Sequence, residues 1–319
     1  MRTVAGVETR CIDPRDATTE DQARWPVCPD EMLAEAVDVS EAPLTDGRDL
    51  LEPSLWNAWA QPLAVQVFDE RYGLDMETRL AGVTVGLDRR FGDNVVFGAT
   101  FAMSDTSTDG FDSLFEAGSD GFAFGPYLAI RLSPNWVLDT SLTYGLYDND
   151  LLLAVLEGDY DSQVWTGNVT AYGQYALGEY FVRPKASVTY GHVDTDAYHL
   201  KGEVLNVPIS VAFPDDSFNF GVAELTAEFS RIYSFENGMT VMPYAEFGAV
   251  YEFDRPSDGQ ILTADLDLVT PSAWTGTLRA GARMQLSDTV QVEASGGYLS
   301  LGQNDLDIWE GKFLVSFGF

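Results

Sequence analysis

The feature that most restricts the fold of this chain is a repeated alternation of apolar and polar residues, which begins near residue 55 and continues to the C-terminus. Alternation with a period of two is typical of β-strands whose two faces meet different surroundings. We interpret the pattern as twelve strands. They are expected near residues 55–68, 78–90, 95–104, 120–132, 136–147, 163–176, 180–191, 219–234, 239–253, 273–286, 289–300 and 307–319.

The connections between these strands alternate between short turns and longer, mostly acidic segments. Short connections such as 133–135 and 177–179 follow every second strand. This sorting is typical of an outer-membrane barrel with short periplasmic turns and long extracellular loops. We therefore predict an all-β, twelve-stranded antiparallel up-and-down transmembrane barrel over residues 54–319, with its C-terminus periplasmic. The long loops, expected to be extracellular, lie near 69–77, 105–119, 148–162, 192–218, 254–272 and 301–306.

The two faces of the predicted strands differ as a membrane barrel requires. In the last strand, Phe313, Val315, Phe317 and Phe319 share one apolar face. An Arg or Lys on the lipid face near the bilayer midplane would cost about 2–4 kcal/mol. Charged residues of the strands fall instead on the opposite face. Those expected to face the lumen are Glu246, Arg279, Arg283, Glu310 and Lys312.

The charge balance excludes some classes of protein. With 50 acidic and 18 basic residues, the formal net charge is -32. Binding to nucleic acid or to an anionic membrane surface needs a basic face, so neither is expected.

The sequence contains no run of 18 or more apolar residues, so no transmembrane helix is predicted. Residues 1–6 lack a basic region followed by an apolar one, so no signal peptide is expected in the sequence as written.

Residues 1–53 differ from the rest of the chain because they lack strand-like alternation and are rich in Asp, Glu, Pro and Arg. We predict that they form a separate N-terminal segment, a pore plug or linker. A short helix is expected near residues 30–39, where Pro29 and Asp30 give a start signal.

The two cysteines of the chain, Cys11 and Cys28, both lie in this N-terminal segment. They are a candidate disulfide, which at this loop length would contribute about 3 kcal/mol. Such a bond would suit an oxidising periplasm or cell surface. The alternative is a pair of unrelated free thiols.

Catalysis and metal binding find little support in the sequence. The two histidines, His192 and His199, fall in one predicted loop, where Asp194 beside a histidine is expected by chance in so acidic a chain. Acidic clusters near residues 105–120 and 148–161 do not have the spacing of a calcium loop. We predict no enzyme activity, no cofactor and no metal site.

Prolines within the strands, at 62, 126, 184 and 243, predict local breaks in pairing.

The stretch from Trp56 to the C-terminus resembles the translocator β-domain of autotransporters, the type V secretion family. The opening strand reads Leu-Trp-Asn-Ala-Trp-Ala-Gln at 55–61, and Gly-Val-Thr-Val-Gly-Leu-Asp follows at 82–88. A glycine-containing strand that ends in serine follows at 97–107. The terminal strand at 312–319 is similar to the signal read by the β-barrel assembly machinery.

The resemblance implies a barrel of twelve strands, anchored in outer-membrane lipid, that exports a passenger segment in cis through its pore. The N-terminal segment would then run through the pore as a helix. No long passenger precedes the barrel in this sequence, and no Asn-Asn pair lies near the junction. The alternatives are a stand-alone channel or a surface-binding barrel without a passenger, and, with least support, an enzyme on a barrel scaffold.

Overall fold

The computed structural model describes residues 3–4, 7–8, 42–45, 47–51, 53–71, 75–111, 113–235, 239–255 and 272–319. The helix expected near 30–39 and both cysteines lie outside these residues. Every regular element within them is a β-strand. No helix in this part of the chain is long and apolar enough to cross a membrane.

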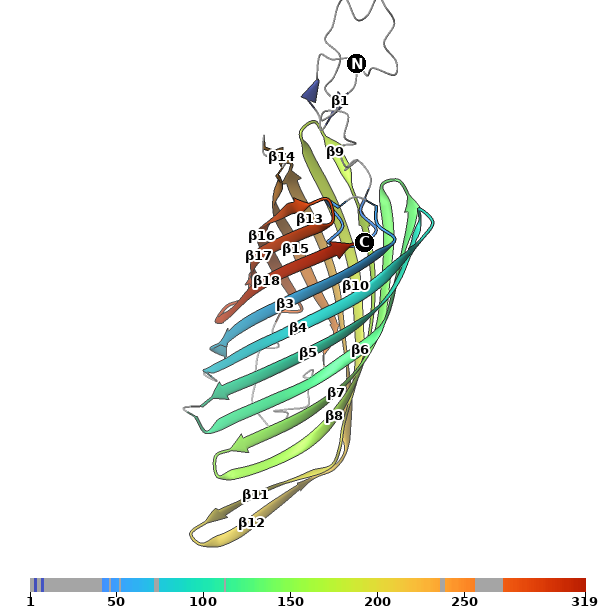
Figure 1. Ribbon diagram of the computed structural model, residues 1–319. Helices are drawn as coiled ribbons and strands as arrows, with labels where there is room; N and C mark the ends of the chain where they lie inside the picture. The colour runs from blue at the N-terminus through green and yellow to red at the C-terminus, as the bar shows by residue number, and fades with distance from the viewer. Residues whose placement is uncertain are drawn as a thin grey trace, which may run out of the picture.

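Twelve long strands form one closed antiparallel barrel, which confirms the predicted fold class. Figure 1 shows them running obliquely around the wall, and the barrel closes where the last strand pairs with the first. The strands are β3 (Trp56–Asp69), β4 (Met76–Phe91), β5 (Val95–Gly110), β6 (Phe115–Ser133), β7 (Trp136–Leu153), β8 (Leu156–Gly173), β10 (Tyr180–Thr195), β13 (Asp216–Arg231), β15 (Thr240–Asp254), β16 (Trp274–Ser287), β17 (Val290–Leu301) and β18 (Leu306–Gly318).

Shorter strands lie at the two ends of the barrel. The pieces β9 (Tyr175–Leu177) and β14 (Tyr233–Ser234) prolong the wall at the end where the short turns lie. At the opposite end, β11 (Tyr198–Val204) and β12 (Val207–Phe213) form a hairpin that projects beyond the wall (Figure 1). A separate pair, β1 (Thr3–Val4) and β2 (Val7–Glu8), lies near the N-terminus.

Two of the predicted loops are wrong, because the segments 105–119 and 148–162 are mostly strand. Strand β5 continues to Gly110 and β6 begins at Phe115, with Asp105 paired opposite Asp120. Strands β7 and β8 likewise continue to a tight turn at residues 154–155. Beyond the hydrocarbon a strand needs no apolar face, so backbone pairing continues after the alternation in hydropathy has ended. Part of the segment 192–218 is also strand, in the β11–β12 hairpin.

The side chains of each strand alternate between an apolar outer face and a polar inner face. The rings of Phe313 and Phe317 on β18, and of Phe319 directly after it, are exposed on the outside, whereas Leu314 and Ser316 are buried inside. The same alternation recurs along the wall. Exposed apolar side chains of the outer face include Val85, Leu87, Phe101, Met103, Phe124, Leu142, Val169, Val188, Leu225, Phe247 and Leu278.

Each proline within a barrel strand lies where pairing with one neighbouring strand is interrupted. At Pro62, β3 pairs continuously with β4, but its pairing with β18 passes from Leu63 directly to Ala60. Proline has no N–H to donate, so one side of the ladder must open at its position. Similar interruptions occur at Pro126 toward β7, at Pro184 toward β8 and at Pro243 toward β13.

Candidate functional site

The chain just before the first barrel strand lies inside the lumen, at the end where the short turns are. We call residues 42–45 and 47–51 the lumen segment. The backbone N–H of Ala42 donates to the carbonyl of Pro134, in the β6–β7 turn, at 3.1 Å. The hydroxyl of Tyr172, on the inner face of β8, donates to the carbonyl of Pro43 at 2.8 Å. These bonds join the lumen segment to the wall near the short-turn rim.

Apolar side chains of the lumen segment pack against the inner wall. Ala42 and Leu44 are buried in a cluster that also contains Tyr127, Val137 and Tyr172. Leu50 is fully buried, and its N–H donates to the side-chain oxygen of Gln291 on β17 at 2.8 Å. The lumen segment therefore docks through both apolar contacts and hydrogen bonds.

Gly47 brings the lumen segment against the closing strand of the barrel. Its φ angle is +81°, a conformation that residues with a side chain rarely adopt. A Cβ atom at this position would lie 3.0 Å from the Cβ of Ser316 on β18. Glycine therefore allows both the turn and the close approach.

Asp49 carries the only described carboxylate of the lumen segment, and two arginines of the wall hold it. Its Oδ1 lies 2.7 Å from Nη1 of Arg183, and its Oδ2 lies 3.6 Å from Nε of Arg283. Gln291 donates to the same carboxylate at 3.3 Å. Burial would raise the pKa of Asp49, but the nearby guanidiniums of Arg283 and Arg183 outweigh burial and hold that pKa well below its usual range.

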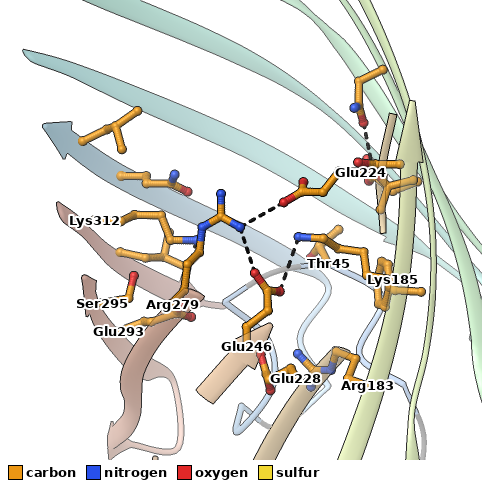
Figure 2. Close-up of a pocket in the computed structure, with 18 of the residues that line it drawn as sticks. Thr45, Arg183, Lys185, Glu224, Glu228, Glu246, Arg279, Glu293, Ser295 and Lys312 are labelled. Atoms are coloured by element: carbon orange, nitrogen blue, oxygen red, sulfur yellow. Dashed lines mark hydrogen bonds and ion pairs between the residues drawn. The ribbon is translucent and has the colours of Figure 1, made fainter. Parts of the chain in front are cut away.

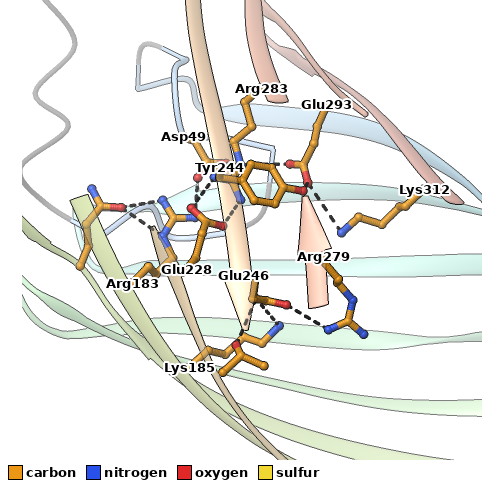
Figure 3. Close-up of polar contacts among 12 residues, drawn as sticks. Asp49, Arg183, Lys185, Glu228, Tyr244, Glu246, Arg279, Arg283, Glu293 and Lys312 are labelled. Carbon is orange, nitrogen blue, oxygen red and sulfur yellow. Dashed lines mark hydrogen bonds and ion pairs between the residues drawn. The ribbon is translucent and has the colours of Figure 1, made fainter. Parts of the chain in front are cut away.

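Arg283, on β16, is the centre of a buried network (Figure 3). Its two terminal nitrogens contact both carboxylate oxygens of Glu228 at 2.7 Å, and its Nε lies 3.1 Å from Glu293. Its guanidinium also lies over the ring of Tyr244, 4.3 Å from the ring centroid. The phenol of Tyr244 donates to Glu293 at 2.7 Å. Such two-pronged contacts fix the geometry as well as the charge.

A second network lies further into the lumen around Arg279 (Figure 2). Its guanidinium lies 2.9 Å from each of three carboxylates, those of Glu224, Glu246 and Glu310. Lys185 lies 3.7 Å from Glu246 on the other side. Five strands, β10, β13, β15, β16 and β18, thus contribute charges to one cluster on the inner face of the wall.

A third polar cluster lies against the first strands of the barrel. The hydroxyl of Tyr127 donates to Asp88 at 2.6 Å and accepts from the indole N–H of Trp59 at 2.9 Å. Arg48 of the lumen segment pairs with the same Asp88. Gly98 leaves room for this cluster, because a Cβ there would lie 2.5 Å from the ring of Tyr127.

Beyond the lumen segment lies a cavity of about 520 Å³. Thr45 lines it, together with the charged networks and with hydroxyl and amide side chains such as Thr100, Ser141, Asn168 and Thr189. Such a surface can form hydrogen bonds with the backbone of a polar chain. Within the described part of the protein, no group of three or more His, Cys, Asp or Glu side chains is arranged to hold a metal ion.

The structure places the five charged residues expected in the lumen on its inner face, within the two arginine networks. Lys312 lies 3.8 Å from Glu293.

Neither histidine joins these networks. His192 contacts Asn219 at 2.7 Å and Asp194 at 3.2 Å, and His199 lies on the projecting hairpin. Cys11 and Cys28 lie outside the described residues, so their pairing remains a prediction.

Several residues of the networks were not singled out from the sequence. Glu224 and Glu228 could have been found, because they alternate with the apolar Leu225 and Phe229 along one strand. Asp49 could not, because the lumen segment has no repeat that assigns a side chain to a face. The three clusters combine partners that are far apart in the sequence.

A closed barrel with an apolar outer face, a charged lumen and part of its own chain inside that lumen defines an outer-membrane β-barrel that carries an internal segment. Residues 58–297 match the model of the autotransporter β-domain family, described as "Autotransporter beta-domain". The chain belongs to this family, as its opening, second and terminal strands indicated.

Solved structures of autotransporters share the fold. The translocator domain of NalP from Neisseria meningitidis superposes with a TM-score of 0.68 at 16% identity, covering 91% of this chain and 95% of that one. The β-domain of the Bordetella autotransporter BrkA gives a TM-score of 0.66 at 19% identity, covering 83% of this chain and 100% of that one. At these identities the likeness concerns the fold.

Curated relatives are much longer than this chain. Outer membrane protein B of Rickettsia rickettsii is 24% identical over 206 residues, which are 58% of this chain and 12% of that protein. The putative uncharacterized protein YaiT of Escherichia coli K12 is 22% identical over 261 residues, which are 78% of this chain and 25% of that protein. This chain therefore spans only a small part of the relatives it matches.

Proposed function

We propose that this chain is the translocator of an autotransporter, which anchors in the bacterial outer membrane and exports a passenger segment in cis through its lumen. The main support for this proposal is that the barrel, an autotransporter β-domain, holds inside its lumen the residues that directly precede its first strand. A passenger joined to the N-terminal side of these residues would be tethered at the pore itself.

The lumen wall suits the passage of an unfolded chain. Two of its arginines are already paired with carboxylates of the wall, Arg279 with Glu224 and Glu310 and Arg283 with Glu228 and Glu293. Between the networks, hydroxyl groups such as those of Ser141 and Thr189 line the cavity. Paired charges and small polar groups offer a passing backbone exchangeable hydrogen bonds and little apolar surface on which to stick.

We propose further that residues 1–53 act as plug and linker. The lumen segment stays near the short-turn rim, because Ala42 is bonded to Pro134 in the β6–β7 turn. The arrangement therefore corresponds to a closed state, in which Asp49 and its arginines hold the plug. Export would need the contacts of this segment to be released or rearranged.

The proposed orientation places Phe319 and the short turns in the periplasm and the acidic connections outside. It rests on the sorting of turn lengths that outer-membrane barrels share. Partners in this proposal are the outer-membrane lipid and the β-barrel assembly machinery, which would read Phe313, Val315, Phe317 and Phe319. We propose a transport barrel and not an enzyme.

Single-channel conductance tests this closed state. Deleting residues 1–50 should raise the conductance of the reconstituted barrel, because the lumen segment no longer fills the short-turn end. The matched control deletes residues 1–41 only, keeps the lumen segment, and should leave the conductance low. Unchanged conductance after deletion of 1–50 would contradict a plug. High solute flux through the intact chain would favour a stand-alone channel over a translocator.

A further inference from the structure

Arg89 stands on the outer face of the barrel, close to the rim where the short turns lie. It shares a face of β4 with the exposed, apolar Val85 and Leu87. Its guanidinium carbon lies 5.5 Å from the centroid of the Trp56 ring and 5.2 Å from that of the Phe91 ring. A cation is thus held between two aromatic rings on a surface that otherwise faces lipid.

The guanidinium of Arg89 has no carboxylate partner among the residues that the structure describes. With respect to the described part of the chain, its five N–H donors are therefore left for another ligand. Arg231 provides the contrast. It lies at the same end of the barrel, 5.5 Å from the ring of Tyr180 and 4.9 Å from that of Tyr233, but Glu179 pairs with it at 2.6 Å.

The distribution of charge makes an unpaired arginine at this rim unusual. The chain has 50 acidic and 18 basic residues. A row of exposed carboxylates on the outer face lies at the opposite end, where Asp105, Asp120, Asp148 and Asp161 are on consecutive strands in direct register. The anion that would neutralise Arg89 must therefore come from outside the described chain.

The depth of Arg89 identifies the source of that anion. An arginine facing hydrocarbon costs about 2–4 kcal/mol at the midplane but about 0–1 kcal/mol near the interface. Arg89 lies two residues before the end of β4, and Trp56 is the first residue of β3. This places the guanidinium at the level of the lipid headgroups, where aromatic rings also collect.

We propose that Arg89, Trp56 and Phe91 form a binding site for the phosphate of a membrane phospholipid headgroup. The planar fork of Arg89 would donate two parallel hydrogen bonds to phosphate oxygens. The two rings would cover the glycerol carbons, and the exposed Phe97, paired with Arg89 across the strands, would contact the acyl chains. The site goes beyond the translocator function and does not depend on it.

The bound lipid would cover the seam where the barrel closes. Trp56 exchanges two backbone hydrogen bonds with the terminal Phe319, at 2.8 and 2.9 Å. A phospholipid held beside Trp56 would shield this last pair of the β3–β18 ladder. At this seam the first strand, β3, and the last strand, β18, are held together by hydrogen bonds and side-chain packing, with no turn to connect them.

Native mass spectrometry of the full chain in a non-ionic detergent tests the site, with dioleoyl phosphatidylglycerol as the probe. Arg89→Gln should weaken lipid retention about tenfold, the loss expected for a charge-assisted hydrogen-bond pair. Arg231→Gln is the matched control and should retain lipid as the wild type does, since Glu179 already satisfies Arg231. Folding of each variant is checked by heat-modifiable migration.

The wild type alone provides a second test. It should retain dioleoyl phosphatidylglycerol but not dioleoylglycerol, which has the same acyl chains and no phosphate. Inorganic phosphate should fail to displace the lipid. Equal retention of both lipids, displacement by inorganic phosphate, or unchanged binding by Arg89→Gln would each overturn the proposal.

Discussion

Asp49, which precedes the first barrel strand in the sequence, forms a 2.7 Å ion pair with Arg183 on β10 inside the lumen. The same carboxylate reaches toward Arg283, which also holds Glu228 and Glu293. The plug and the wall therefore share one buried charge network, and the stability of one depends on the other.

The first prediction concerns the substitution Asp49→Asn. It removes the charge that Arg183 and Arg283 share with the lumen segment, and breaking a buried ion pair typically costs about 3–5 kcal/mol. We expect the segment to leave its site more often, seen as more frequent open events in single-channel recordings. Asp69→Asn, which breaks a more exposed pair with Arg71, is the control. An unchanged open fraction in Asp49→Asn would show that the pair does not hold the plug.

The pH dependence of plugging follows from the same carboxylate. The pKa of Asp49 is lowered in the folded protein from its ordinary value of 3.8. A lowered pKa means that the stabilisation is fully present above that ordinary value and is lost as the pH falls through the folded-state pKa. We expect steady conductance from neutral pH to about pH 5 and more open events only in stronger acid. In the Asp49→Asn variant, which has no carboxylate to protonate at this position, the frequency of open events should not rise with acid in this way.

Arg283→Met tests the wall network itself. The substitution leaves Glu228 and Glu293 buried beside each other without the guanidinium that contacts both. The cost should be about 3–5 kcal/mol, seen as a lower denaturant midpoint for the barrel. Arg79→Met removes an arginine whose side chain is 63% exposed and should change the midpoint little. Equal midpoints for the two variants would argue against a stabilising role for the network.

Gly98→Val tests the fit of Tyr127 against β5. A side chain at this position meets the Tyr127 ring, so the strand or the ring must move, at a cost of about 1–3 kcal/mol. Gly311→Val is the matched control, because a Cβ at Gly311 meets no atom within 4 Å. The unfolding midpoint should fall in the first variant only. A comparable fall in the control would point to strand propensity and not to the ring contact.

Truncation at Phe319 separates a side-chain signal from barrel closure. Removing the residue deletes two backbone hydrogen bonds with Trp56, whereas Phe319→Ala keeps them and removes only the ring. If the ring is read during assembly, both variants should form less heat-modifiable barrel in cells. If closure alone matters, only the truncation should be impaired. Normal assembly of both variants would contradict the proposed role of the terminal residue.

The barrel could be predicted from the sequence because the bilayer imposes a two-residue repeat on every spanning strand. The outward Phe313 and Phe317 and the inward Arg279 and Arg283 followed from that repeat alone. The ends of the strands could not be predicted in the same way. Strand pairs such as β5–β6 continue past the membrane, where Asp105 faces Asp120 and hydropathy no longer marks the backbone.

Only some features of the contacts in the lumen could be predicted from the sequence. Alternation shows that Arg279 and Glu310 face inward, but not that they touch, because contact depends on strand tilt and register around a closed wall. The position of Asp49 depends on a segment with no repeat at all. Its partners, Arg183 and Arg283, lie far along the chain and become neighbours only when the barrel closes.

Surface exposure of an N-terminal reporter tests the translocator proposal most directly. The full chain is expressed in a Gram-negative host behind a cleavable signal peptide, with an epitope fused ahead of Met1. The account predicts that external protease removes the epitope from intact cells that contain the folded, heat-modifiable barrel. An epitope that becomes accessible only after the outer membrane is permeabilised, with the barrel folded, would contradict it.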